Sequence, residues 1–336
     1  MRYNQNSGYG QAVLNSLHNL VPTLGKRMLV MNSANTDEQN YKMAQEIFLS
    51  DPEGVTRFYT SLATAYTAAE SNNNDVIMLD GNSSHALATA LTVSKSRIHF
   101  IGLDGGGRYL QQGAKVQNTD GTAAVFVVKN TGTRNSYQNI KFIQVDDDAT
   151  SLTVYQEGGE GTYMKNCSVV FGVADNLDQT DAYEVVFGGD SCTYDSCTFG
   201  NDTLLTSAAR TVFIFDQVTA SQEAKSNIIK DCVWQISSSS ADALFVSMAA
   251  AGDILFTNLF IRPIFQASVD SAGGVALTKA VTTANGVTKG TVNLYMPCAF
   301  NVTDLGVNGT NNDRLQVYGP SFTSGTDLVG VAPVAT

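Results

Sequence analysis

The sequence predicts an all-β protein, a single-stranded parallel β-helix whose three-strand coils span about 27–35 residues. One observation is a short pattern that occurs five times between residues 138 and 262: a polar residue, an apolar residue, a spacer and a second apolar residue. Internal periods of 20–50 residues indicate a solenoid, a propeller or an array, and alternation with period 2 indicates a strand. The copies begin at Asn139, Asn166, Ser196, Asp231 and Asn258, which are 27, 30, 35 and 27 residues apart.

A second set of apolar strands recurs at nearly the same period. Each member precedes a copy of the first pattern, and the residues between them are rich in Gly, Asn, Asp and Ser, which favour turns. A propeller blade needs about 40–45 residues and four strands, and a β-sandwich shows no repeating register. A coil of three short strands fits the period better than either. The second set comprises residues 125–128, 152–155, 184–187, 212–215 and 244–246.

Stacking the copies about 4.8 Å apart brings equivalent residues into columns that line the interior. These columns are the predicted structural core. The first apolar position contributes Ile140, Cys167, Cys197, Cys232 and Leu259, and the second contributes Phe142, Val169, Phe199, Trp234 and Ile261.

Residues 1–55 do not follow the repeat and are predicted to form an N-terminal arm or docking segment. The apolar spacing indicates helices over residues 12–20 and 40–49, and residues 28–31 form a candidate strand. A plainer interpretation is a cap that packs on the first coil, because terminal repeats of a solenoid need covering.

Residues 56–265 are predicted to be the β-helix with its N-terminal cap. Residues 58–69 have helical apolar spacing, and residues 75–79, 88–93 and 97–102 form candidate strands. A helix followed by the letters D-V-I-M-L-x-G and then I-x-F-I-G resembles the first coil of pectate-lyase-like right-handed β-helix proteins. The resemblance implies a right-handed solenoid whose helix closes the open end. It implies no activity, because this fold carries lyases, hydrolases and non-enzymatic proteins.

Residues 266–336 are predicted to be a C-terminal β-rich cap and tail. The clear register of the repeat is lost there, and candidate strands cover residues 287–295 and 314–318. The remainder has small residues and little charge, which suits a segment that covers the last coil or reaches a neighbouring subunit.

Composition bears on the partners of the protein. The 336 residues carry a net charge of -11 and no basic run, which argues against nucleic acid as a partner. No stretch of about 20 apolar residues is present, so the sequence predicts no membrane span.

The five cysteines leave at least one thiol unpaired, and three share one predicted column, where they would act as small apolar fillers. Their spacing and the scarcity of histidine predict no metal or other cofactor.

Two acidic motifs are the candidates for catalysis. The triplet N-T-D that ends at Asp120, followed by Asp146 and Asp147, resembles the first two motifs of polygalacturonases. That family also requires a glycine-flanked histidine and an R-I-K triplet, whereas this chain has no histidine after His99 and has R-P-I at Arg262. The favoured interpretation is therefore an acidic turn with no catalytic residue; Asp120, Asp146 and Asp147 remain the candidate carboxylates if the protein is a glycoside hydrolase.

A polysaccharide lyase would need a calcium site and a basic residue that abstracts a proton. Asp175, Asp178, Asp181 and Glu184 could supply oxygen ligands, but the neighbouring Lys165 and Arg210 show no sign of that role. These aspartates are more simply explained as turn residues.

The order of the regions resembles that of phage structural proteins: a short N-terminal segment, the entry to a β-helix and a glycine-rich tail. The resemblance implies a non-enzymatic virion protein, assembled in the host cytoplasm, that decorates or cements the capsid. Its expected partners are other copies in a homotrimer and the major capsid or other virion proteins. The absence of a recognisable export signal fits a phage protein, which lysis releases. The alternatives are a tailspike-type depolymerase of host polysaccharide, and a polysaccharide lyase or adhesin.

Overall fold

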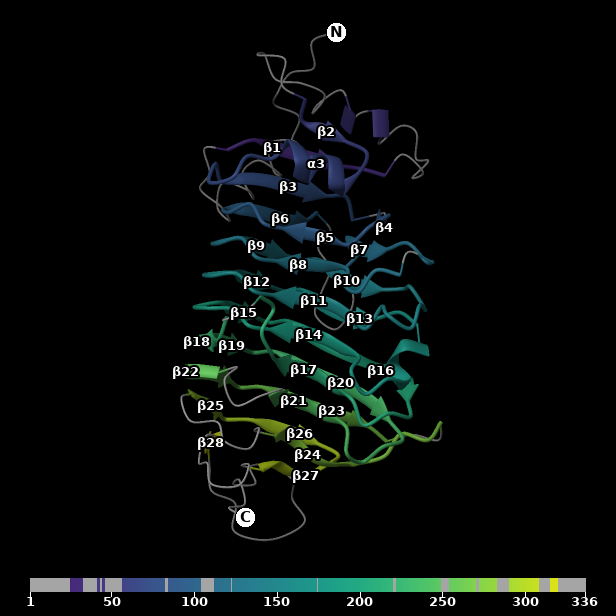
Figure 1. Cartoon of the computed structure of the whole chain (residues 1–336), viewed down its shortest axis with the longest axis vertical. Helices are drawn as coiled ribbons and strands as arrows, with labels where there is room; N and C mark the ends of the chain where they lie inside the picture. Colours follow the sequence, from purple (N-terminus) through teal and green to yellow (C-terminus); the bar gives the residue numbers. More distant parts are fainter. Residues whose placement is uncertain are drawn as a thin grey trace.

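The computed structural model shows a right-handed parallel β-solenoid of about seven turns (Figure 1). Each coil contributes one strand to each of three sheets, and the chain advances along the long axis from its N-terminal to its C-terminal end. This confirms the predicted fold class. The structure describes residues 25–32, 41–42, 44–45, 56–81, 84–103, 112–121, 123–173, 175–219, 222–248, 254–269, 272–282, 290–307 and 315–319.

Among the described residues, sheet 1 has more strands than either of the other two sheets. All of its strands pair in parallel, and their order follows the sequence except that β1 lies between β2 and β3 and that β18, outside the series, pairs with β22. Its strands are β1 (Arg27–Val30), β2 (Phe58–Tyr59), β3 (Asp75–Leu79), β6 (Ile98–Gly102), β9 (Ser136–Gln138), β12 (Tyr163–Lys165), β15 (Thr193–Asp195), β18 (Ala224–Lys225), β19 (Ile228–Lys230), β22 (Ile254–Ile261), β25 (Gly290–Tyr295) and β28 (Leu315–Tyr318).

Sheets 2 and 3 form the other two faces, again with parallel pairing. Sheet 2 consists of β4 (Ser84–Leu87), β7 (Lys115–Asn118), β10 (Lys141–Gln144), β13 (Ser168–Phe171), β16 (Thr198–Thr206), β20 (Val233–Ser238), β23 (Ile264–Ser268) and β26 (Cys298–Phe300). Sheet 3 consists of β5 (Leu91–Val93), β8 (Val128–Asn130), β11 (Thr153–Glu157), β14 (Tyr183–Phe187), β17 (Thr211–Phe215), β21 (Leu244–Met248), β24 (Leu277–Thr282) and β27 (Val302–Val307).

The corner between sheet 1 and sheet 2 is a two-residue turn that repeats from coil to coil. Its first residue has a positive φ, a conformation that Asn, Asp and Gly tolerate best. This requirement explains the polar residue at the head of the sequence repeat. The φ angles are 56° at Asn139, 49° at Asn166, 57° at Ser196, 54° at Asp231 and 50° at Arg262.

The second residue of this turn and the second residue of the following strand point into the core. Phe142, Val169, Phe199 and Trp234 are in register and buried. Ile140, Cys167, Cys197 and Cys232 occupy the turn position beside them and are equally buried.

The last copy of the repeat lies in a different segment from the one that the sequence pattern predicts. Leu259 and Ile261 belong to β22 of sheet 1, where Phe260 is the buried residue between them. The columns continue instead through Pro263 and through Phe265, which pairs with Trp234. The pattern misled because alternation is the same in every sheet, and because the true copy is headed by Arg262 rather than by a small polar residue.

The predicted capping helix is present as α3 (Leu62–Ala68), preceded by the short strand β2. Ser61 caps its N-terminus by accepting a hydrogen bond from the Thr64 amide, and Leu62, Ala65 and Tyr66 pack on the core. At the C-terminal end of α3, the Lys95 ammonium donates hydrogen bonds to the carbonyls of Tyr66, Thr67 and Ala69 at 2.7–2.8 Å. These bonds satisfy carbonyl acceptors that the end of a helix leaves without a partner in the helix.

The sheets extend beyond residues 56–265 on both sides. β1 adds a strand from the first region, and β24 to β28 continue the coils through the last region. The strands expected at residues 28–31, 287–295 and 314–318 correspond to β1, β25 and β28. The helix expected at residues 12–20 and the tail after residue 319 lie outside the described residues, and only four residues of the helix expected at 40–49 are described. Among the described residues, no helix combines the length and the apolar character that a membrane crossing requires.

Candidate functional site

The three candidate carboxylates converge at one corner of the solenoid. Asp120 follows β7, and Asp146 and Asp147 follow β10 on the next coil, both in the connection from sheet 2 to sheet 3. One carboxylate oxygen from each residue lies within 4.8 Å of the others. Stacking of successive coils therefore unites two motifs that are 26 residues apart in the sequence. Such a group can share a proton or present oxygen ligands to a hard cation.

Asp146 has a structural role within this cluster. It is fully buried, and its carboxylate accepts hydrogen bonds at 3.2 Å from the backbone amides of Gly121, Ala124 and Asp148. It thereby joins the corner loops of two coils. Asp120 and Asp147 are exposed, so they are the two that remain open to a substrate or ion.

Asn118 and the histidines His85 and His99 have structural roles as well. The Asn118 side chain of the N-T-D triplet is buried and accepts a hydrogen bond from the Val145 amide at 3.0 Å. His85 contacts the Asp80 carbonyl at 3.0 Å and His99 contacts the Ser136 hydroxyl at 2.8 Å. Burial lowers the pKa of both histidines, and neither belongs to the carboxylate cluster.

Among the described residues, the acids considered for a lyase form no group of three or more that could share an ion. Glu184 is buried in a two-pronged ion pair with Arg210, at 2.7 and 3.0 Å. Asp178 accepts a hydrogen bond from the Ser207 amide at 2.6 Å, and the Asp175 side chain lies outside the described set. Within the described residues, the only group of acids, histidines and cysteines close enough to share an ion is the trio of Asp120, Asp146 and Asp147.

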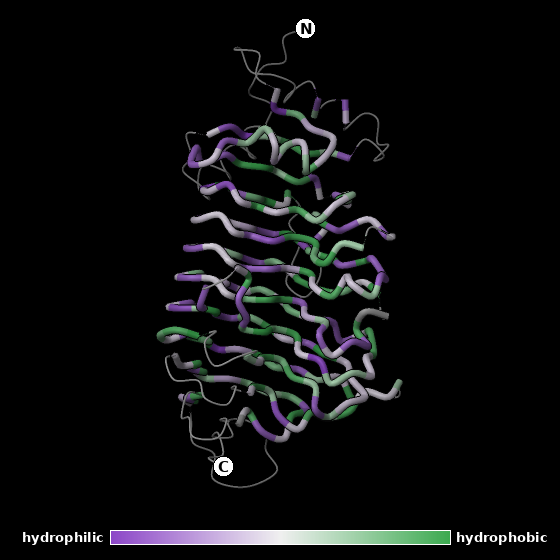
Figure 2. The backbone as a smooth tube through the Cα atoms, viewed as in Figure 1, coloured by the Kyte–Doolittle hydropathy of each residue, from purple (hydrophilic) through white to green (hydrophobic). Residues whose placement is uncertain are grey.

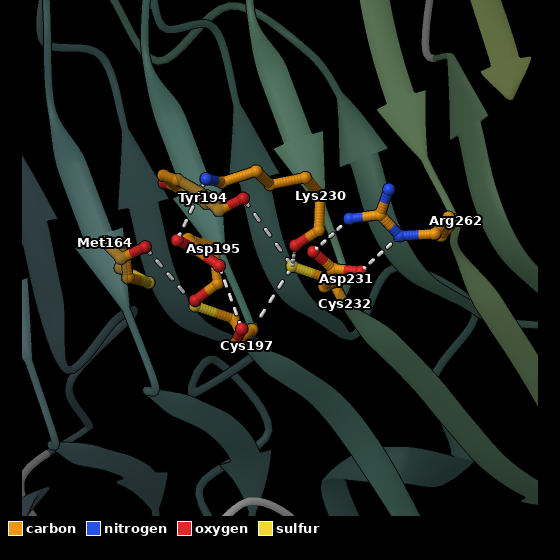
Figure 3. A network of polar contacts seen from close by, with 9 residues as sticks. Met164, Tyr194, Asp195, Cys197, Lys230, Asp231, Cys232 and Arg262 are labelled. Carbon is orange, nitrogen blue, oxygen red and sulfur yellow. Dashed lines mark hydrogen bonds and ion pairs between the residues drawn. The ribbon is translucent and has the colours of Figure 1, made fainter.

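The buried cysteines of the first interior column also form hydrogen bonds with the backbone. Among the described residues all five cysteines are free thiols. The Cys197 thiol donates to the carbonyls of Met164 and Asp195 at 3.6 and 3.5 Å, and the Cys232 sulfur accepts from the Cys197 amide at 3.3 Å. Ion pairs flank this column on the outside, between Lys230 and Asp195 and between Arg262 and Asp231 (Figure 3). The thiols therefore satisfy backbone groups of the sharp turns, a role that spacing alone does not reveal.

A buried carboxylate, Glu157, lies at the corner between sheet 3 and sheet 1. It ends β11, has no exposed surface, and is surrounded by groups that donate to it. Burial raises the pKa of Glu157, and these hydrogen bonds oppose the rise. The donors to one oxygen are Asn130 at 2.9 Å, the Gly159 amide at 2.7 Å and Thr162 at 3.2 Å; the donors to the other are the phenols of Tyr155 at 2.9 Å and Tyr194 at 3.2 Å.

This arrangement predicts a pH-dependent contribution to stability. Because the pKa of Glu157 is raised in the folded state, its contribution is largest at acidic pH, where the carboxyl is neutral in both states, and is lost as the pH rises through the folded-state pKa. In Glu157→Gln this loss is absent, so the stability of the variant should rise relative to that of the natural protein as the pH increases towards neutral. Urea denaturation from pH 4 to pH 8 measures it. Glu160→Gln at an exposed position is the control, and parallel pH profiles for natural protein and Glu157→Gln would contradict the prediction.

Sequence reasoning missed a group of side chains on the outer face of sheet 1. Tyr295 and Tyr318 occupy paired positions in β25 and β28, and their rings stack at 4.6 Å with an interplanar angle of 11°. Both are exposed, at 37% and 43%. The signal in the sequence is the spacing of Asn293 from Tyr295 and of Gln316 from Tyr318, which is recognisable only once β25 and β28 are known to be neighbours.

Comparisons with known proteins assign no family to the chain. No family model matches the chain, and no curated protein matches it. Among solved structures, a pectin methylesterase from Yersinia enterocolitica is similar with 12% identity and a TM-score of 0.43, over 80% of this chain and 93% of that one. A pectin methylesterase from Erwinia chrysanthemi has 11% identity and a TM-score of 0.36, over 88% and 94%. The strand pairing shows a parallel β-helix, and similarity at this level carries no argument about family, activity or substrate.

Proposed function

We propose that this protein is a non-enzymatic structural protein of a virion, a phage capsid decoration protein that binds other virion proteins as a homotrimer. The observation that carries the proposal is the use of the buried carboxylates as structural elements. Asp75 accepts hydrogen bonds from the backbone amides of Lys26 and Glu70, both at 2.7 Å. Asp146, Glu157 and Glu184 are likewise held by loop amides, by phenols and amides, and by Arg210.

This use of charge suits a rigid scaffold better than a catalyst. A catalytic carboxylate has to reach the substrate, whereas these four are enclosed and tie successive coils together. The phage setting is suggested by the organisation of the sequence. Repetition of weak contacts in a symmetric trimer would supply avidity for a particle surface.

Location on the particle tests the proposal directly. Phage particles that carry the protein are labelled with an antibody against it and imaged by electron microscopy. Label distributed over the capsid shell is the expected result. Label confined to the tail tip, or none on the particle, would overturn the decoration role.

Attachment through the N-terminal region is tested by deletion. Because β1 belongs to sheet 1, removal of residues 1–55 would also remove a strand, so the informative deletion is residues 1–24. We expect this variant to lose at least ten-fold in binding to particles that lack the protein, with its melting temperature unchanged. Undiminished binding would show that attachment uses another surface.

A tailspike-type depolymerase is the second candidate, because Asp120 and Asp147 lie exposed beside Asp146. If it is correct, the protein releases reducing ends from host surface polysaccharide, and Asp120→Asn together with Asp147→Asn abolishes the release. Asp202→Asn, on a later coil, is the matched control. Activity that survives the double substitution would remove this cluster from consideration.

A further inference from the structure

One outward-facing row of side chains on sheet 1 changes from charged to apolar and aromatic along the solenoid. It runs through Lys165, Asp195, Lys230, Ile261, Tyr295 and Tyr318, which are in register on successive strands. Lys230 and Asp195 form an ion pair at 3.1 Å, whereas the row is apolar or aromatic from Ile261 onward. Figure 2 shows β22 as a hydrophobic segment, whereas the left-hand ends of the coils at β12 and β15 are hydrophilic.

The neighbouring outward row ends in two amides. Asn293 and Gln316 are paired between β25 and β28, two residues before Tyr295 and Tyr318 on their strands. We refer to these four side chains as the Tyr–amide platform. The Tyr318 hydroxyl donates to the Gln316 carbonyl oxygen at 2.6 Å, so that hydroxyl is already engaged and the aromatic faces are held in place.

Asn293 carries an unused acceptor. Only 7% of this residue is exposed, and its side-chain oxygen has no hydrogen-bond partner. A buried polar atom without a hydrogen-bond partner destabilises the folded state, so such atoms are rare unless a ligand or a water completes them. Its position beside two exposed rings provides a hydrogen-bond acceptor next to an apolar surface.

The size and charge of the platform restrict the ligand. Two adjacent strands are about 4.8 Å apart and residues i and i+2 about 6.6 Å apart, so the platform matches one pyranose ring, far below the roughly 800 Å² that each partner of a stable protein complex buries. None of its four side chains is charged, and the nearby Arg262 is paired with Asp231 at 2.7 Å.

We infer that the Tyr–amide platform binds a neutral pyranose unit of an oligosaccharide. The apolar C–H face of the sugar packs against the exposed surface of the Tyr295 and Tyr318 rings, and the Asn293 side chain turns outward so that its oxygen accepts a hydrogen bond from one sugar hydroxyl. Binding to a single ring on an open surface gives a Kd of about 1 mM. The site lies on sheet 1, apart from the acidic corner between sheets 2 and 3.

The inference is tested by NMR titration of the full chain with cellohexaose, maltohexaose, mannohexaose and chitohexaose, with hexagalacturonate as the acidic comparison. We expect at least one neutral oligosaccharide to bind and hexagalacturonate to bind at least ten-fold more weakly. Tyr318→Ala should weaken binding by at least ten-fold and Asn293→Ala by about three- to ten-fold. Tyr318→Phe should stay within about two-fold of the natural protein, because the hydroxyl is engaged by Gln316.

Tyr163→Ala, on the same outer face near the middle of sheet 1, is the matched control and should bind like the natural protein. Circular dichroism melting of each variant separates loss of the site from loss of the fold. Absence of binding to all neutral oligosaccharides, equal binding of hexagalacturonate, or normal binding by a folded Tyr318→Ala would each overturn the inference. If no sugar binds and Tyr318→Ala instead loses attachment to particles, the platform is a protein contact, and the decoration role stands without it.

Discussion

Replacement of Arg210 by methionine is expected to lower the free energy of unfolding by about 3–5 kcal/mol. Arg210 and Glu184 are both fully buried, and the guanidinium holds the carboxylate through two hydrogen bonds. Burial raises the pKa of Glu184, and Arg210 opposes that rise. Without the guanidinium, the carboxylate is left enclosed with no counter-charge. Urea denaturation at pH 7 measures the loss.

A second substitution separates the charge effect from the packing effect. In the double variant Arg210→Met, Glu184→Leu neither charge remains, and most of the lost stability should return because an apolar pair of similar volume is often as stable as a buried ion pair. Arg134→Met, at an exposed position on another coil, should change stability by less than about 0.5 kcal/mol. A loss below about 1 kcal/mol in Arg210→Met would mean that water reaches Glu184 when the arginine is removed.

Cys197→Asp is expected to destabilise the solenoid by more than about 4 kcal/mol. The natural thiol is buried and donates to the carbonyls of Met164 and Asp195. A carboxylate would place negative charge against these two acceptors, in a column bounded by Cys167 and Cys232. We expect the purified variant to melt far below the natural protein, or to accumulate as insoluble chain.

Two further substitutions show whether the loss of stability comes from burying a charge. Cys197→Ser keeps a donor to the same carbonyls and should cost much less than Cys197→Asp. Cys298→Asp introduces the same charge at a half-exposed position and should leave the fold intact. A thermal transition of Cys197→Asp within a few degrees of that of the natural protein would refute the assignment of Cys197 to the interior.

The sequence identified the residues of the acidic corner, but it did not show whether their carboxylates are available for chemistry. Asp120, Asp146 and Asp147 could be selected because they resemble the first two motifs of polygalacturonases, and the structure brings them together. Whether a carboxylate is free for chemistry depends on the amides around it. Three amides enclose Asp146, and they come from loop residues whose path no pattern in the sequence describes.

Periodicity by itself determined the solenoid, its capping helix and most of its interior columns. Each strand alternates with period 2, and each turn needs a residue that tolerates positive φ, so local chemistry repeats wherever the coil repeats. Only the tertiary structure decided that Pro263 and Phe265, rather than Leu259 and Ile261, continue the columns, and that Glu157 and the pair of Glu184 and Arg210 lie inside. It alone placed Tyr295 against Tyr318. Alternation fixes which residues share a face, but the register between strands, set by contacts across whole coils, fixes which residues meet.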